Sequence, residues 1–225
     1  TGTGSFLVEV LRHIYRAIVT GPDDVEGVVA YHKAVTERIR GFEILPAAYV
    51  IAHLQVHTLL SIEQQAPLEP GAQAGVFLTN ALTGWSKEAP QPVLFPALAT
   101  ERDRAPRVKH EEPILVVLGN PPYSAFAGVA PVEEGGLLDD YKAGLNKPES
   151  QGGWGIRRFN LDDLFVRFFR IAEMRVAERT HEGVVCFIAP RAWTDDASFV
   201  VMRQRIQRRA TSISIDDMHG DSREN

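Results

Sequence analysis

The chain has 225 residues, 44% of them hydrophobic and 24% charged, which is ordinary for a globular protein with a sizeable core. Its formal net charge is -5, so the chain as a whole lacks the basic character of a protein that holds nucleic acid by bulk electrostatics. Any nucleic-acid binding would therefore come from a local patch or from another domain.

The single cysteine and the absence of long apolar stretches predict in which cellular compartment the protein works. Cys186 excludes an internal disulfide and fits reducing conditions, and its place in the apolar run 183–190 predicts a buried thiol. No apolar stretch approaches the ~20 residues of a membrane span, and the first residues lack the charged start of a signal peptide. We therefore expect a soluble, cytoplasmic protein without a membrane partner.

The first part of the chain alternates helical and strand patterns. After the glycine turn at 1–4, apolar residues recur at helical spacing and predict an amphipathic helix. A second helical stretch covers residues 24–40. Residues 41–44 are typical of a short strand, and Pro46 suits the first turn of a third helix over 47–60.

The same alternation continues through the rest of the chain. Continuous apolar runs, of the kind buried on both faces of a parallel sheet, lie at 74–78, 114–118 and 183–189. Helical patterns cover 162–179 and 198–209, and residues 212–218 predict a last strand. Strands that alternate with helices predict an α/β fold with an open, doubly wound and mostly parallel sheet.

Two segments interrupt this rhythm. Residues 83–110 hold four prolines and many charges, which predicts a surface excursion with one short helix. Residues 124–160 are rich in Gly, Pro and polar side chains, which predicts a long functional or disordered loop. Candidates for phosphate contact or base stacking near this loop are Lys142, Lys147, Trp154, Arg157 and Arg158. A solvated charged loop explains them equally well.

The tetrapeptide at 120–123 directly follows the strand predicted at 114–119, at the end of the strand where ligands bind in a doubly wound sheet. The lone pair of an adenine amino group is delocalised into the ring, so this nitrogen is a poor nucleophile. The side-chain oxygen of Asn120 and a backbone carbonyl can each accept one of its N–H bonds, which favours a tetrahedral nitrogen aimed at an incoming methyl group. Pro121 stiffens the turn, and Tyr123 offers a face to a flipped base. A simple strand-ending turn would use the same residue types.

A second candidate site combines the glycine turn with an acidic residue. Gly2 and Gly4 let the backbone approach a ligand, and the helix that follows offers free N–H groups to a carboxylate. Glu43 ends the next strand and can accept hydrogen bonds from both ribose hydroxyls of a nucleoside cofactor. A helix-leading turn and a solvated glutamate are the plain alternatives.

Several segments, in this order along the chain, resemble one family of enzymes. They are TGTGSFL, GFEILPAAYVIAHL, FLTNAL, GNPPYS, DDLFVRFFRIAE, GVVCFIAPRAW and MHGDSREN. Together they resemble the adenine-specific, gamma-class DNA amino-methyltransferases, and in particular the methylase module of Type ISP restriction–modification enzymes. The resemblance spans nearly the whole chain, 1–225, as one methyltransferase domain. It implies a Rossmann-like methyltransferase sheet and S-adenosylmethionine as cofactor.

The resemblance also implies roles for individual residues. Thr1, Gly2 and Gly4 would contact the methionine part of the cofactor, and Glu43 its ribose. Asn80, after the third strand of the family, would stand near the cofactor's adenine ring. The target base, an adenine flipped out of double-stranded DNA, would be held by the site formed from Asn120, Pro121 and Tyr123.

The resemblance predicts that this domain is partial. In the family a first strand precedes the glycine loop, and a last strand and a target-recognition domain follow, so we expect truncation at both ends. Nuclease and helicase domains are expected in the same parent chain. The sequence leaves two alternatives open: a non-catalytic DNA-binding or assembly module of a defence protein, and an amino-methyltransferase for RNA or protein glutamine. His13, His53 and His57 lack a partner set, so no metal site is expected.

Overall fold

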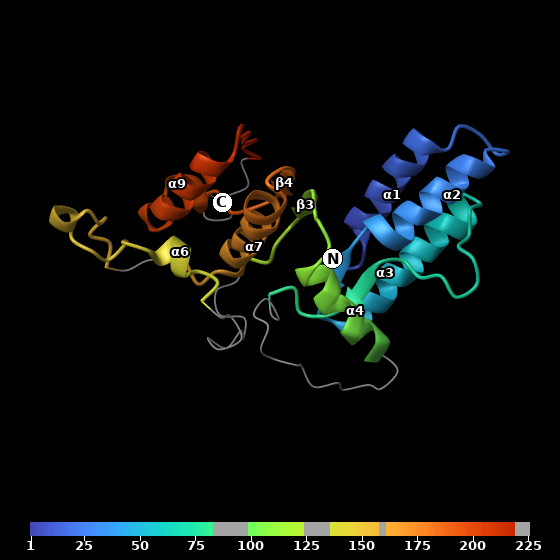
Figure 1. Cartoon of the computed structure of the whole chain (residues 1–225), viewed down its shortest axis with the longest axis horizontal. Coiled ribbons are helices and arrows are strands. Elements are labelled where there is room, and N and C mark those ends of the chain that lie inside the picture. The colour runs from blue at the N-terminus through green and yellow to red at the C-terminus, as the bar shows by residue number, and fades with distance from the viewer. Residues whose placement is uncertain (83–98, 124–135, 158–160, 219–225) are drawn as a thin grey trace. The chain divides into compact units, whose positions relative to one another are not determined.

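The computed structural model describes residues 1–82, 99–123, 136–157 and 161–218, and divides into two compact units, Thr1–Glu112 and Pro113–Asn225 (Figure 1). Each unit holds one pair of parallel strands together with helices. The alternation of strands and helices read from the sequence is therefore confirmed. A doubly wound sheet that includes both strand pairs stays a prediction, because the described strands form two separate sheets.

The first unit places helices beside the parallel strands β1 and β2. The helices are α1 Ser5–Ile18, α2 Val25–Lys33, α3 Pro46–Thr58 and α4 Ala99–His110, and α2 and α3 continue as π-helical turns over Ala34–Arg38 and Leu59–Glu63. Strand β1, Gly41–Glu43, pairs with β2, Val76–Leu78, so that Glu43 lies opposite Leu78. The ends of the helices follow from local chemistry: the Asp24 carboxylate caps α2 by accepting the Gly27 N–H at 2.8 Å, and Pro46 occupies the first turn of α3.

The core of the first unit lies between α1, α2 and α3. Its buried side chains are Val8, Leu11, Tyr31, Val35, Val56, Leu59 and Leu60. The Tyr31 hydroxyl satisfies its hydrogen bond at the edge of this core by donating to Gln64 Oε1 at 2.7 Å. A second, smaller cluster packs α4 under β2 through Phe77, Ala105 and Val108. The helix expected within residues 83–110 is thus present as α4, but it packs against β2 instead of lying in a surface excursion; residues 83–98 lie outside the described residues.

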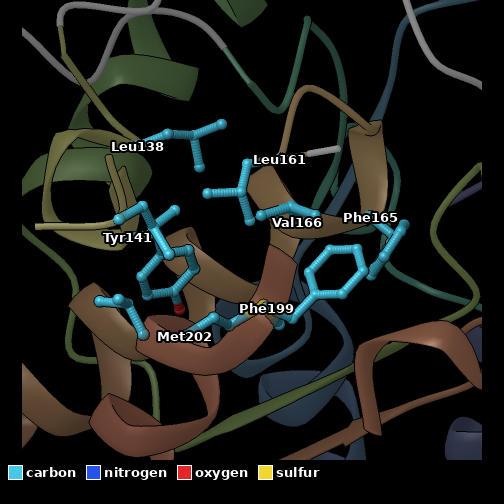
Figure 2. Close-up of a cluster of buried hydrophobic side chains, with 9 residues drawn as sticks. Leu138, Tyr141, Leu161, Phe165, Val166, Phe199 and Met202 are labelled. Atoms are coloured by element: carbon cyan, nitrogen blue, oxygen red, sulfur yellow. The ribbon is translucent and has the colours of Figure 1, made fainter. Parts of the chain in front are cut away.

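The second unit contains the parallel strands β3, Val116–Gly119, and β4, Val184–Phe187. Its helices are α6 Asp139–Lys142, α7 Leu164–Ala172, α8 Ala192–Asp195 and α9 Val200–Arg209, with a π-helical extension of α7 over Glu173–Thr180 and 3-10 turns at Glu149–Gln151 and Ala197–Phe199. Figure 2 shows the core that joins α6, α7 and α9, in which Tyr141, Phe165 and Met202 are almost fully buried.

The prediction of a long loop at 124–160 is wrong for residues 137–145, where Leu138, Tyr141 and Leu145 are buried in the core of the second unit. Residues 146–157 are mostly exposed and, apart from the 3-10 turn at Glu149–Gln151, form a loop as predicted. The abundance of Gly and polar residues concealed a few apolar side chains at spacing suited to α6. Residues 124–135 and 158–160, which include Arg158, lie outside the described residues.

Three further predictions for the second unit are wrong. Residues 212–218 form no strand; Ile213 and Ile215 are exposed, because an alternating pattern makes a strand only where a neighbour supplies hydrogen bonds, and no described strand pairs there. Strands β3 and β4 are not buried on both faces, since Val116 and its register partner Val184 are 58% and 59% exposed. Cys186 lies exposed on β4, so the predicted buried thiol is also wrong.

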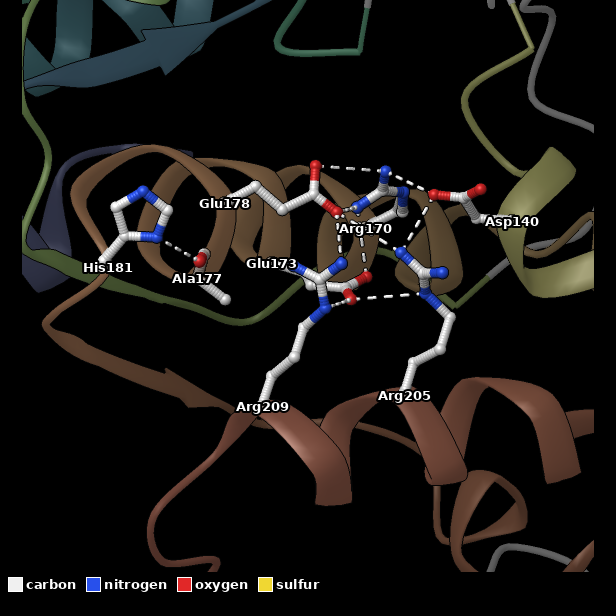
Figure 3. A network of polar contacts seen from close by, with 8 residues as sticks. All are labelled: Asp140, Arg170, Glu173, Ala177, Glu178, His181, Arg205 and Arg209. Carbon is white, nitrogen blue, oxygen red and sulfur yellow. Dashed lines mark hydrogen bonds and ion pairs between the residues drawn. The ribbon is translucent and has the colours of Figure 1, made fainter.

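A network of charged side chains joins α6, α7 and α9 (Figure 3). Arg170 donates to Glu178 at 2.7 Å and to Asp140 at 2.8 Å, and it also pairs with Glu173 at 3.1 Å. Arg205 and Arg209 reach the same Glu173 carboxylate from α9, at 3.3 and 2.9 Å. The Glu173 side chain is only 5% exposed and pairs with three guanidinium groups, whose charges it balances together with Asp140 and Glu178.

We expect Glu173→Gln to lower the free energy of unfolding by roughly 3 kcal/mol, because it removes one of the three carboxylates that balance three guanidinium charges and leaves one positive charge uncompensated in the network. Glu37→Gln is the matched control, since the Lys33–Glu37 pair is 3.9 Å long with both side chains about 60% exposed, and we expect it to cost less than about 1 kcal/mol. Urea unfolding of both variants measures the difference. Equal losses in the two proteins would show that the network contributes no more than a surface pair.

Candidate functional site

The glycine turn leads directly into α1 and packs closely against α3. Gly2 and Gly4 adopt positive φ angles of 60° and 95°, which glycine accepts at little cost. A Cβ atom on Gly4 would lie 3.0 Å from Ala52 Cα, so a side chain there would push α1 away from α3. Among the described residues, no side chain caps the start of α1. The local structure thus offers a close-packed helix N-terminus to an anionic group.

Glu43 ties this turn to the end of β1. Its Oε2 accepts the Gly2 N–H at 2.7 Å, and its Oε1 accepts the N–H groups of Ile44 and Leu45, both at 2.9 Å. The Thr1 nitrogen donates to the Phe42 carbonyl at 2.8 Å, beside the same strand. Glu43 is therefore buried and satisfied, rather than solvated as one reading of the sequence allowed. Three of its roughly four acceptor positions are used in this state.

Asn80 follows β2 at the same end of the strand pair. The Thr79 N–H donates to the Glu43 carbonyl at 2.8 Å, which extends the ladder by one residue. The Asn80 side-chain oxygen accepts the Leu82 N–H at 2.9 Å and so closes a tight turn. The first unit thus brings together Thr1, Gly2, Gly4 and Glu43, and it places Asn80 at the carboxyl end of the neighbouring strand.

Lys109 on α4 is a polar residue of this region that the sequence analysis missed. The residue is only 4% exposed, and its Nζ donates to the Asn80 carbonyl at 2.7 Å and to Thr79 Oγ1 at 3.1 Å. Burial lowers the pKa of Lys109 from its usual 10.5 to about 8. Helical spacing could have revealed it, since Ala105, Val108 and Lys109 share the buried face of α4.

The lowered pKa of Lys109 predicts a pH-dependent stability. Between pH 8 and 10.5 the unfolded chain binds more protons at this group than the folded chain, so the free energy of unfolding should rise with pH across that window. Relative to Lys109→Met, which cannot titrate, native protein should gain up to about 3 kcal/mol between pH 7 and 10.5. Urea unfolding of both proteins at several pH values measures this, and a constant difference would contradict it.

The second unit places the tetrapeptide 120–123 at the carboxyl end of β3. The Tyr123 hydroxyl donates to Asn120 Oδ1 at 2.6 Å and lies 3.5 Å from the Ile188 carbonyl oxygen. The Ile188 N–H donates to the Gly119 carbonyl at 3.1 Å, so the end of β4 lies beside the tetrapeptide. Pro121 is buried while Asn120 and Tyr123 are exposed. The structure therefore brings the three candidate residues together, with the acceptor oxygen of Asn120 facing a donor.

The basic residues considered for phosphate contact differ in their surroundings. Lys142 pairs with Asp162 at 3.2 Å, so it already has an anionic partner. Lys147 and Arg157 are exposed, and the Trp154 ring is 39% exposed. Among the described residues, no group of three or more His, Cys, Asp or Glu is placed to hold a metal ion, and no helix is long and apolar enough to cross a membrane.

The fold is shared with parts of solved complexes of large proteins with DNA. One is the ATP-dependent Type ISP restriction–modification enzyme LlaBIII bound to DNA, with a TM-score of 0.65, 20% identity, and coverage of 90% of this chain and 13% of that chain. The DrdV–DNA complex has a TM-score of 0.68 and 21% identity, and the match covers 92% of this chain and 18% of that chain. A nuclease-deletion mutant of the Type ISP restriction–modification enzyme LlaGI, in complex with a DNA substrate mimic, has a TM-score of 0.64 and 22% identity, with coverage of 91% of this chain and 16% of that chain.

These matches concern the fold of a segment of each larger protein. The chain spans between 13% and 18% of the length of these three chains. No protein-family model matches the chain, and no curated protein matches it at a significant level.

Proposed function

We propose that this chain is the methyltransferase part of a restriction–modification enzyme, and that it modifies the exocyclic amino group of adenine in double-stranded DNA. The observation that supports this most strongly is the placement of Asn120, Pro121 and Tyr123 at the carboxyl end of β3, in a fold shared with restriction–modification enzymes bound to DNA. The proposal includes S-adenosylmethionine as cofactor, and nuclease and helicase domains as partners in the complete protein.

The residues of the first unit fit such a cofactor. Its carboxylate would lie at the N-terminus of α1, where Gly4 keeps the backbone close and no side chain in the described part of the chain caps the helix. Its ribose hydroxyls would donate to Glu43, which exchanges the Gly2 N–H for one of them. Asn80, held in its turn, would lie beside the purine. When bound, S-adenosylmethionine supplies an electrophilic methyl group.

The residues of the second unit would prepare the target. The Asn120 oxygen accepts an N–H of the adenine amino group in place of the Tyr123 hydroxyl, and a backbone carbonyl of the buried Pro121 turn accepts the other. Both acceptors withdraw the nitrogen from conjugation with the ring. The Tyr123 ring, released from Asn120, stacks on the flipped base. No metal ion and no covalent intermediate is needed for this transfer.

The test is the DNA of cells that express the complete natural protein in a bacterial host lacking adenine methylation. We expect single-molecule sequencing to find N6-methyladenine at one recurring sequence, and to find none when Asn120→Ala protein is expressed. Unmodified genomic DNA with methylated RNA would favour an RNA substrate. Methylated glutamine in a host protein would favour a protein substrate. If the native protein binds DNA but methylates neither DNA, RNA nor protein, a non-catalytic module would be favoured.

A further inference from the structure

Lys109 is a buried cation that contacts Asn80, one of the proposed cofactor residues. A lysine that is 4% exposed is rare, because an ammonium group loses its hydration on burial. Among the described residues, two oxygen atoms at the carboxyl end of β2 compensate part of this loss. There Nζ meets the Asn80 carbonyl oxygen at 2.7 Å and the Thr79 hydroxyl at 3.1 Å. A charge-assisted bond of this kind holds backbone more firmly than a neutral one.

The same ammonium group also reaches the neighbouring strand. Its Nζ lies 5.4 Å from the centroid of the Phe42 ring, in the position of a cation over an aromatic face. Phe42 immediately precedes Glu43, and the Phe42 carbonyl accepts a hydrogen bond from the Thr1 nitrogen. Lys109 therefore contacts Phe42, which precedes Glu43 on β1, and the turn of Asn80 after β2, so one side chain from α4 links both strand ends.

We propose that Lys109 is a positioning residue for the cofactor site: it fixes the turn at 79–82, so that Asn80 is already placed when the purine of the cofactor enters. This role rests on the proposed function. The Asn80 residue is held twice, at its carbonyl by Lys109 and at its side-chain oxygen by the Leu82 N–H. Without the ammonium group the turn would have to be ordered by the ligand, which lowers affinity.

The experiment compares cofactor affinity with turnover in the complete natural protein. Lys109→Met keeps the length of the side chain and removes its charge, and Lys109→Arg restores a cation. The matched control is Arg40→Met: Arg40 is also a largely buried cation, which donates to the Thr36 and Ile39 carbonyls and to Glu112 at the opposite, amino end of β1.

The probe is S-adenosylhomocysteine, whose Kd is measured by titration calorimetry, beside kcat at saturating S-adenosylmethionine and the melting temperature. We expect Lys109→Met to raise Kd roughly ten- to hundredfold while kcat stays within about twofold of native. Lys109→Arg should recover part of the affinity. Arg40→Met should lower the melting temperature about as much as Lys109→Met does, but it should leave Kd within about twofold of native.

Three outcomes would overturn the role. Native affinity in Lys109→Met would show that Asn80 needs no anchor. Equal increases of Kd in Lys109→Met and Arg40→Met would show that both act only through stability. Native protein that binds neither S-adenosylhomocysteine nor S-adenosylmethionine would overturn the proposed function and this role with it, and that failure is recognised without any variant.

Discussion

Asn120→Ala should lower the rate of methyl transfer roughly a hundred- to thousandfold, the loss seen when one oriented polar group is removed from a reaction centre. The physical reason is that Asn120 Oδ1 is an acceptor already aligned at the end of β3, where the Tyr123 hydroxyl bonds to it at 2.6 Å. Alanine offers the target amino group no acceptor, so the lone pair of the amino nitrogen stays delocalised into the adenine ring. Cofactor affinity should be nearly unchanged, because Glu43 and the glycine turn are intact.

The measurement is single-turnover transfer of labelled methyl groups to unmodified DNA, together with the Kd of the cofactor. Two variants of Tyr123 serve as controls. Tyr123→Phe keeps the aromatic face and removes only the hydroxyl bonded to Asn120, so transfer should persist. Tyr123→Ala also removes the face, and retention of the base should weaken by ~1–3 kcal/mol. Transfer by Asn120→Ala at the native rate would refute the role of Asn120.

Glu43→Gln should weaken binding of S-adenosylmethionine roughly a hundredfold. The Glu43 carboxylate accepts three backbone N–H groups, from Gly2, Ile44 and Leu45, and would accept ribose hydroxyls when the cofactor binds. A carboxamide replaces one acceptor oxygen with an NH₂ group, which would face a backbone donor. The substitution thus removes a ribose partner and also loosens the glycine turn.

Titration calorimetry of the native and variant proteins measures this loss of affinity. Glu63→Gln is the control, since Glu63 forms only an exposed ion pair with Arg12 at 2.8 Å and should bind cofactor normally. Glu43→Asp, which keeps the charge on a shorter side chain, should bind with intermediate affinity. Unchanged affinity in Glu43→Gln would show that Glu43 only shapes the turn.

The local elements were predictable because their signals are local. The glycine turn before α1, the proline at the start of α3 and the apolar runs of the strands each depend on neighbouring residues. Because β1 and β2 are parallel, their carboxyl ends share one edge of the pair, which places Glu43 and Asn80 at the same end. The hydrogen bonds between Glu43 and the turn, and between Tyr123 and Asn120, could not be read from spacing.

The failures share one cause, which is that burial depends on partners distant in sequence. The apolar run of β3 predicted two covered faces, yet Val116 is exposed because the described residues leave its face uncovered. Ile213 and Ile215 alternate like a strand but have no described strand to pair with. Conversely, the polar composition of 136–157 predicted a loop, although Tyr141 in this segment is fully buried. Lys109 was missed because a charged residue on a helix is usually solvated.

The most direct test of the account is transfer of a labelled methyl group by the complete natural protein. The protein is incubated with S-adenosylmethionine labelled in its methyl group and with unmodified double-stranded DNA, and the DNA is then digested to nucleosides. We predict that the label appears in N6-methyldeoxyadenosine, and that Asn120→Ala lowers it roughly a hundredfold or more. Label confined to a methylated cytosine, or no label in DNA when cofactor binding is intact, would contradict the proposed adenine methyltransferase.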